Sequence, residues 1–327
     1  MVRPPYPDFH DSAPTRFTRF LDILIRFASL RRLSVSAVLT GVLLLAAPAA
    51  VFAQSGDPRW FIEDRANLLV IMLLICGAIL FYTIRATRGA DYFVRKIAGI
   101  SAIEEAVGRA TEMGKPVLFI PGIQDLDNVQ TVAGITILAS VARKVAEYET
   151  QLNVPTSRSL VMTTARETVK EAFLSAGRPD LYNDSMVYYV TDEQFGFVAY
   201  ADGFIVRQRP ATCIYMGAFF AESLILAETG NSVGAIQIAG TAQPTQLPFF
   251  VAACDYTLIG EELFAASAYL SQEPKLLGSL RGQDFGKAFA MLFILIGTAV
   301  ATISLATGGS LSGLMDTLNH WFHVAAG

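Results

Sequence analysis

The residues of this chain that could take part in chemistry lie just after a series of short apolar runs. Polar or glycine residues at such positions hold ligands in open parallel α/β sheets, at the carboxyl ends of the strands. The candidates are Gly122, Gln124, Asp125, Asp127, Asn128, Thr163, Thr164, Arg166, Thr191, Asp192, Gly240, Thr241, Gln243 and Asp255. We expect them to line one polar crevice that binds a ligand. The simpler alternative is that the Thr, Asp and Asn residues only cap helices.

Three of these places suggest particular chemistry. Thr164 and Arg166 belong to a Thr-Ala-Arg-Glu capping box, and the helix start that it predicts would favour an anion. Asp125 and Asp127 could supply oxygen ligands to a divalent cation, although paired acids in a loop are commonly solvated turn formers. Cys254 beside Asp255 is either a reactive thiol or a buried, inert cysteine.

Several kinds of site are excluded by what the chain lacks between residues 85 and 287. Its three histidines, His10, His320 and His323, all lie outside that stretch, which removes Ser-His-Asp triads and histidine metal sites. The three cysteines form no CxxC pair, and neither GxGxxG nor GxxxxGK[ST] occurs. We therefore assign no catalytic residue and no metal ligand, leave the cofactor open, and lean away from an enzyme.

The elements that would position the candidates alternate between short β-like runs and longer helical patterns. Strands are expected at 116–120, 159–163, 186–190, 212–216, 235–238 and 249–253. Helices are expected at 101–114, 129–150, 164–175, 218–228 and 258–271. Residues 193–209 are ambiguous because Asp202-Gly203 would suit a hairpin, but the apolar spacing favours a helix. This alternation predicts an α/β, Rossmann-like three-layer fold with a mostly parallel sheet of about six strands.

Two apolar segments bracket this region and predict transmembrane helices. Residues 66–84 and 288–306 contain no charged side chain, and each is about 19 residues long, enough to cross a hydrocarbon core. Arg85, Arg88, Arg95 and Lys96 follow the first segment, so the positive-inside rule places residues 85–287 in the cytoplasm. The predicted location is the bacterial inner membrane, with the chain crossing it more than once.

The two ends of the chain are expected on the outer side. Residues 1–53 contain an apolar stretch that ends in a Val-Phe-Ala cleavage-like triplet, and they form either a signal peptide or a retained signal anchor. Residues 54–65 then form a short external segment. Residues 307–327 form an external amphipathic tail with Trp321 at the headgroup level.

The chain resembles a family of uncharacterised bacterial membrane proteins. The resemblance rests on three features: a transmembrane segment followed by basic residues, the strand and turn sequence PVLFIPG at 116–122, and a second transmembrane segment after Gly286. It covers roughly residues 66–306. It implies a membrane-tethered α/β domain and supplies no catalytic residue.

These observations favour a non-enzymatic, oligomeric scaffold or ligand sensor in the membrane. The alternatives are a membrane-bound enzyme that uses a nucleotide-type ligand, and an accessory subunit of a transport or secretion complex. The expected partners are the lipid bilayer and either further copies of the chain or other membrane proteins. A net charge of −4 argues against nucleic acid as a partner.

Overall fold

The computed structural model of the chain describes residues 66–90, 92, 97–307 and 313. They belong to two compact units, one formed by Met1–Gly77 with Ala288–Gly327 and the other by Ala78–Lys287. The second unit contains the α/β domain. The predicted leader, the external segment at 54–65 and the tail beyond residue 307, apart from Gly313, lie outside the described residues.

The α/β unit is built on one open sheet of six parallel strands. These are β1 (Val117–Ile120), β2 (Leu152–Thr156), β3 (Val187–Tyr189), β4 (Thr212–Met216), β5 (Ile236–Thr241) and β6 (Tyr256–Ile259). Their spatial order is β3-β2-β1-β4-β5-β6, and every neighbouring pair is parallel. The predicted Rossmann-like α/β fold is thereby confirmed.

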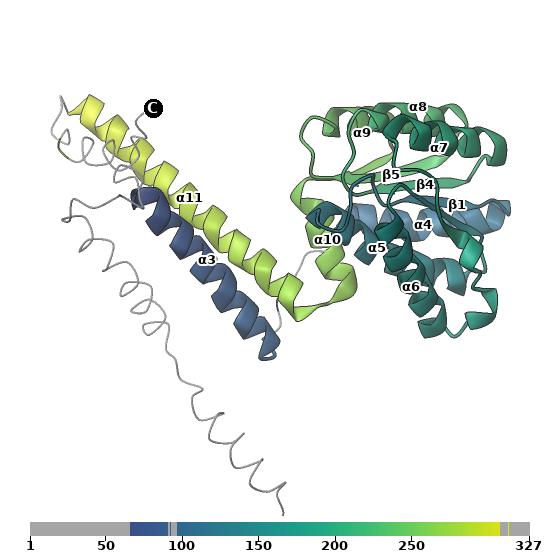
Figure 1. Ribbon diagram of the computed structural model, residues 1–327. Helices are drawn as coiled ribbons and strands as arrows, with labels where there is room; N and C mark the ends of the chain where they lie inside the picture. The colour runs from purple at the N-terminus through teal and green to yellow at the C-terminus, as the bar shows by residue number, and fades with distance from the viewer. Residues whose placement is uncertain (1–65, 91, 93–96, 308–312, 314–327) are drawn as a thin grey trace, which may run out of the picture. The chain divides into compact units, whose positions relative to one another are not determined.

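Helices cover both faces of this sheet (Figure 1). One layer holds α4 (Ala98–Met113), α5 (Val129–Glu147), α6 (Ser159–Ser175) and α10 (Glu261–Ser271); the other holds α7 (Gln194–Gln208), α8 (Glu222–Ser232) and α9 (Leu247–Ala253). Two short 3₁₀ helices, η3 (Pro179–Leu181) and η4 (Asp184–Met186), precede β3.

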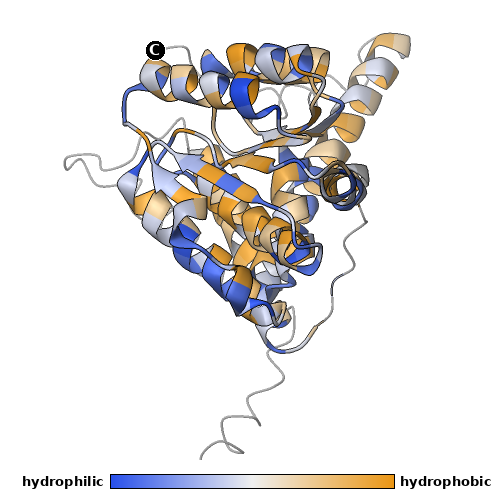
Figure 2. Ribbon diagram, turned by 90° about the vertical axis from the view of Figure 1, so that its right-hand side faces the viewer, coloured by the Kyte–Doolittle hydropathy of each residue, from blue (hydrophilic) through white to orange (hydrophobic). Residues whose placement is uncertain are grey.

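The central strands β1, β4 and β5 each contribute to two separate cores because successive side chains point to opposite faces. Val117 and Phe119 of β1 join the cluster beneath α4, α5 and α6. Leu118 and Ile120 join the cluster beneath α7, α8 and α9. Burial on both faces explains why β1 and β4 are largely apolar, and Figure 2 shows hydrophobic residues concentrated on the strands and on parts of the helices.

Two of the expected strands are wrong. Residues 159–163 form the start of α6. The strand that precedes this helix is β2, which begins seven residues before it. β2 has the sequence LNVPT, whose Asn and Pro are poor strand formers, so the neighbouring SLVMT run was the more strand-like of the two. Tertiary burial overrides that local preference, since Leu152, Val154 and Thr156 are all buried.

The second error concerns residues 249–253, which lie in α9. Pro248 occupies the first turn of α9, where its missing N–H costs nothing. The last strand is β6, and the expected helix at 258–271 begins only at Glu261. A short apolar run does not by itself distinguish a strand from a buried helix. The ambiguous segment at 193–209 is a helix, α7, as favoured from the sequence.

Two long apolar helices complete the described chain, α3 (Ala66–Thr87) and α11 (Pro274–Ala306). Both are long and apolar enough to cross a membrane, and so by composition is α5, but most of α5 is buried in the α/β unit as a core helix. The expected spans at 66–84 and 288–306 lie within α3 and α11. α11 begins at Pro274, well before the second expected span.

Asp202 gives the α/β unit a testable pH dependence. Burial raises the pKa of this α7 carboxyl above its ordinary value of 3.8, opposed by a hydrogen bond from Thr229, and its Oδ1 atom has no partner within the described residues. A raised folded-state pKa means that stability is lost as pH rises from about 3.8 through the folded-state pKa. Asp202→Asn should therefore raise the unfolding midpoint at pH 7 but not below pH 3.8.

Thermal unfolding of the full chain in detergent, followed at several pH values, measures this effect. Glu228→Gln, on the facing helix α8 and exposed, is the matched control and should change neither midpoint. An Asp202→Asn midpoint equal to wild type at pH 7 would show that the carboxylate carries no desolvation cost.

Candidate functional site

The carboxyl ends of β1 and β4 form the candidate site. The chain leaves β1 toward β2 on one side of the sheet and leaves β4 toward β5 on the other, so these adjacent strands are the topological switch point. In open α/β sheets, ligands bind in the crevice at that point. The loops that begin at Pro121 after β1 and at Gly217 after β4 would have to form its walls.

The two loops are instead in direct backbone contact. The Ile123 N–H donates to the Ala218 carbonyl oxygen at 3.1 Å, and a Cβ atom added at Gly217 would lie 2.6 Å from the Pro121 carbonyl oxygen. The Gly217 N–H continues the β4–β5 ladder by donating to the carbonyl oxygen of Gly240 at 2.9 Å. Gly122 has φ +81°, and a Cβ atom added there would lie 2.7 Å from the Ala218 carbonyl oxygen. Only glycine permits both this conformation and this approach. The chain itself therefore fills the central part of the crevice.

A buried glutamine closes the side of the crevice next to β5. Gln130, in the first turn of α5, accepts hydrogen bonds at its Oε1 atom from the Thr241 hydroxyl at 3.2 Å and the Ala242 N–H at 2.7 Å. Thr241 is fully buried and Gln130 nearly so. The Gln130 Oε1 atom and the Thr241 hydroxyl are therefore both used within the chain.

Ser157 and Arg158, directly after β2, close the opposite side. The Ser157 hydroxyl donates to the Ile123 carbonyl oxygen at 3.1 Å, and Arg158 Nε donates to the same oxygen at 3.4 Å. Arg158 Nη1 also lies 3.9 Å from the Asp192 carboxylate. The guanidinium thereby links the ends of β1, β2 and β3.

One carboxylate at this edge is completely buried. Glu222, at the start of α8, accepts from the Phe220 N–H at 2.7 Å and from Gln194 Nε2 at 2.5 Å. Both of its oxygen atoms are thus engaged by neutral donors, which compensates part of the cost of burying a charge. Glu222 ties the first turn of α7 to the loop after β4.

Sequence reasoning missed Gln130, Ser157, Arg158, Gln194 and Glu222. Two of them, Ser157 and Arg158, directly follow β2, which the sequence patterns did not predict. A correct prediction of this strand would have placed both residues at the crevice. For Gln130, Gln194 and Glu222 the sequence gives no comparable pattern, because their roles depend on contacts between segments far apart along the chain.

Among the predicted residues, most of those at the carboxyl edge act in helix caps and turns. Asn128 caps α5 by accepting from the Gln130 N–H at 2.9 Å, and Asp125 accepts from the Leu126 N–H at 2.8 Å. Thr191 accepts from the Glu193 N–H at 3.2 Å, and Thr241 accepts from the Gln243 N–H at 3.2 Å. Gly122 and Gly240 make the close backbone contacts described above. Asp127 is exposed, and Gln124 contributes its carbonyl oxygen to a 3.4 Å bond from Thr131.

The other predicted residues lie elsewhere. Thr163, Thr164 and Arg166 are in the body of α6, because this helix begins at Ser159 and not at the predicted capping box. Arg166 donates to the Val187 carbonyl oxygen at 3.0 Å and so packs along the edge strand β3. Asp255 precedes β6 and accepts from the Gln237 N–H at 2.8 Å, which places it at the amino end of the sheet. These four residues are not part of the crevice.

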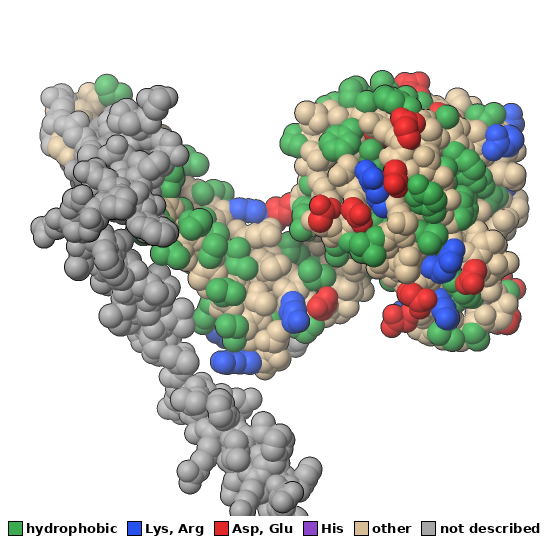
Figure 3. Space-filling view, viewed as in Figure 1, with side chains coloured by type: hydrophobic (Ala, Val, Ile, Leu, Met, Phe, Trp, Pro, Cys, Tyr) green, Lys and Arg blue, Asp and Glu red, His purple; other side chains and the backbone are tan. Residues whose placement is uncertain are grey.

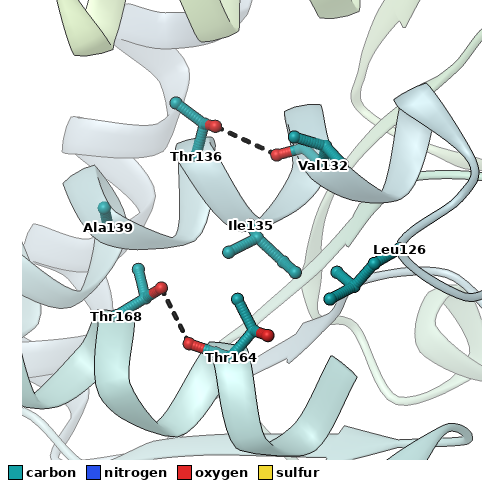
Figure 4. A pocket seen from close by; sticks show the side chains of 7 residues that line it. All are labelled: Leu126, Val132, Ile135, Thr136, Ala139, Thr164 and Thr168. Carbon is teal, nitrogen blue, oxygen red and sulfur yellow. Dashed lines mark hydrogen bonds between the residues drawn. The ribbon is translucent and has the colours of Figure 1, made fainter. Parts of the chain in front are cut away.

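The structure supplies an open groove away from the crevice, between α5 and α6. It has a volume of about 400 Å³ and is lined by Leu126, Val132, Ile135, Thr136, Ala139, Thr164 and Thr168. Figure 4 shows Thr136 donating to the Val132 carbonyl and Thr168 donating to that of Thr164. Thr164 donates to Leu160 in the same way. With these hydroxyls engaged by their own helices, the groove presents mainly methyl and aliphatic groups.

The cysteines of the α/β unit are unsuited to nucleophilic chemistry. Burial raises the pKa of the Cys213 thiol to about 12 and that of the Cys254 thiol to about 12, so both remain protonated at neutral pH. This favours the inert alternative for Cys254. Within the described ranges, no three His, Cys, Asp or Glu residues are grouped so that they could hold a metal ion.

The strand order and the two helical layers define a doubly wound, parallel α/β domain with a Rossmann-like sheet, in which the loops after β1 and β4 contact each other at the central crevice. The chain belongs to the family described as Domain of unknown function (DUF6754), whose model matches residues 56–311. No curated protein and no solved structure matches the chain.

Gly122→Ala tests whether the loop contact at the crevice is structural. The added methyl group meets the Ala218 backbone in a left-handed conformation, so we expect the free energy of unfolding to fall by roughly 2–4 kcal/mol. Gly108→Ala, in the middle of α4 with nothing within 4 Å of the added atom, should instead gain up to about 1 kcal/mol. Urea unfolding of both variants measures the difference, and equal stabilities would contradict the close contact.

Proposed function

We propose that this protein is a membrane-anchored scaffold whose α/β domain assembles through its helical surfaces and catalyses no reaction. The observation that carries the proposal is the filled switch-point crevice, where Gly122, Gln130 and Arg158 bond to neighbouring loops and strand ends. A domain of this class that used a nucleotide would need that space free for the ligand.

The anchor proposed for the scaffold consists of α3 and α11. Their apolar segments carry no Asp, Glu, Lys, Arg or His between residues 66 and 84 or between 288 and 306, which also argues against an ion path. Arg85 and Arg88 follow the first segment, and Arg281 and Lys287 precede the second. The positive-inside rule then supports a cytoplasmic domain at the bacterial inner membrane, held by more than one crossing.

The surface proposed for assembly is the α5–α6 groove. Val132, which lines it, is 46% exposed, and Val129 of α5 and Leu160 of α6 are 67% and 53% exposed, so these helices present aliphatic side chains to solvent. On the face of the α/β unit seen in Figure 3, acidic and basic side chains are interspersed, with hydrophobic side chains between them. Such a surface suits a protein partner better than nucleic acid.

The occupant that we propose for the groove is a second copy of the chain. Anchoring in one membrane holds every copy in the same orientation and raises their effective concentration, so a modest apolar contact suffices for assembly. The proposed homo-oligomer accounts for the exposed aliphatic groups without a further component. A different membrane protein in the groove is the competing outcome, and it would appear as a heterologous complex.

Val132→Glu tests this assembly. The chain purified in mild detergent should be larger than one copy by light scattering, and a carboxylate in the groove should shift it to a single copy because burying that charge is costly. Val206→Glu, on α7 and 55% exposed, is the matched control and should keep the wild-type mass. A wild-type chain that stays single at all concentrations, or a Val132→Glu variant that keeps its mass, would contradict the proposal.

A nucleotide screen tests the alternative that the chain is an enzyme with a nucleotide-type ligand. Because internal contacts occupy the crevice, we expect mono- and dinucleotides to leave the thermal unfolding midpoint of the full chain unchanged. A nucleotide that raises the midpoint by several degrees, with the rise lost in Gln130→Ala, would favour the enzyme over the scaffold.

A further inference from the structure

The α5–α6 groove continues past its apolar part into a second hollow with polar and charged walls. This hollow has a volume of about 260 Å³ and shares Thr136, Ala139 and Thr168 with the first. Beyond the shared residues, its lining includes Arg143 from α5 and Glu171 from α6. The same pair of helices therefore presents an apolar half and a charged half along one continuous groove.

The two halves lie in the same order on both helices because α5 and α6 run in the same direction. Each helix follows a strand of one parallel pair, β1 or β2, so both begin at the carboxyl edge of the sheet. Figure 4 shows Thr136 of α5 across the groove from Thr168 of α6. The exposed Val129, Val132 and Leu160 belong to the first turns of the two helices. The apolar half thus lies at the start of the helix pair and the charged half nearer its end.

The opposite charges of the second hollow are not paired with each other. Both side chains are exposed, and neither has an ion-pair partner in the part of the chain that the structure describes. Arg143 comes seven residues after Thr136 and Glu171 three after Thr168, so at 1.5 Å per residue their heights along the helices differ by about 6 Å. That difference is within the combined reach of an arginine and a glutamate side chain that approach from two different molecules.

A partner for this groove must be apolar at one half and carry both a cation and an anion at the other. The groove itself has this pattern. In a contact with two-fold symmetry, the same surface of each copy faces the other, and every contact occurs twice. Two copies joined by their α5–α6 faces would therefore supply each unpaired charge with a partner in the other copy.

The distribution of charge selects the direction of the two-fold axis. An axis across the helices would place the charged half of one copy on the apolar half of the other, where the charges would lose water without gaining partners, at a high cost. An axis along the helices keeps apolar against apolar. It also sets α5 of one copy against α6 of the other, so that Arg143 meets Glu171 of the second copy.

We propose that two copies of the chain bind each other through their α5–α6 faces, with the two-fold axis along these helices and with Arg143 of each copy paired to Glu171 of the other. The inference rests on the proposed self-assembly and adds to it the face, the direction and the number of copies. The apolar halves cover each other, and the two reciprocal ion pairs fix the register because like charges brought together would oppose any other alignment.

Arg143→Glu and Glu171→Arg test the pairing, since each variant puts two like-charge contacts into the symmetric dimer. Each alone should raise the concentration at which half of the full chains in mild detergent are single, by roughly tenfold or more in light scattering. Coexpression of the two variants with different tags should restore a two-copy complex that contains one of each. The introduced carboxylate then faces the introduced guanidinium, and the two native side chains face each other. A misfolded variant would give no such rescue.

The matched controls lie on the opposite helical layer. Arg207→Glu on α7 and Glu228→Arg on α8 alter exposed charges of the same kinds and should keep the wild-type mass, singly and together. Ile225→Glu, on the exposed apolar side of α8, should also keep it. Loss of assembly in Ile225→Glu would indicate a head-to-tail contact between opposite layers and would overturn the two-fold arrangement.

The remaining outcomes separate this inference from the proposed function. Charge variants that assemble like wild type, a coexpressed pair that forms no mixed complex, or a wild-type complex of three or more copies would each overturn the two-fold pairing and leave self-assembly intact. A wild-type chain that stays single at every concentration would contradict the proposed function as well.

Discussion

The pairing of β1 with β4 is the interaction on which the rest of the fold depends. β1 lies between β2 and β4, and its four residues are in register with Thr212–Tyr215, so the two halves of the sheet are joined only through this ladder. The loops that follow must pass each other closely, and the glycine at 122 allows their backbones to touch. Hydrogen bonds from Ile123, Ser157 and Arg158 then use the donors and acceptors left at the strand ends.

The polar groups at the strand ends are hydrogen-bonded within the chain, and this bears on function. Buried polar atoms are costly without partners, and at the carboxyl ends of β1, β2 and β5 they find them in neighbouring loops and strand ends of the same chain. The position where related architectures bind a ligand is thereby used to hold the sheet together. The assembly that we propose uses the outer surface of the helices, where the hydroxyl groups lining the α5–α6 groove donate to their own helices.

Sequence patterns predicted the α/β class, the parallel sheet and four of the six strands, because these four strands are short runs of mostly apolar residues. They failed at β2, where Asn153 and Pro155 conceal a buried strand, and at β6, where the apolar run in α9 resembled a strand. Because of these two errors, candidate residues were predicted in the wrong place. Arg166 lies beside the edge strand β3, and Asp255 lies at the amino end of the sheet, opposite the crevice. Asn128 was recognised correctly as a possible cap because capping is local.

The sequence by itself determined the fold class, the two apolar segments and the absence of histidine from the α/β domain, since these depend on composition and on periodicity over a few turns. Only the tertiary structure decided which polar residues meet. Gln130 reaches Thr241 across more than a hundred residues of chain, and Gly282 meets Ile79 across two hundred. Contacts of that range depend on the packing of whole elements, which no local pattern encodes.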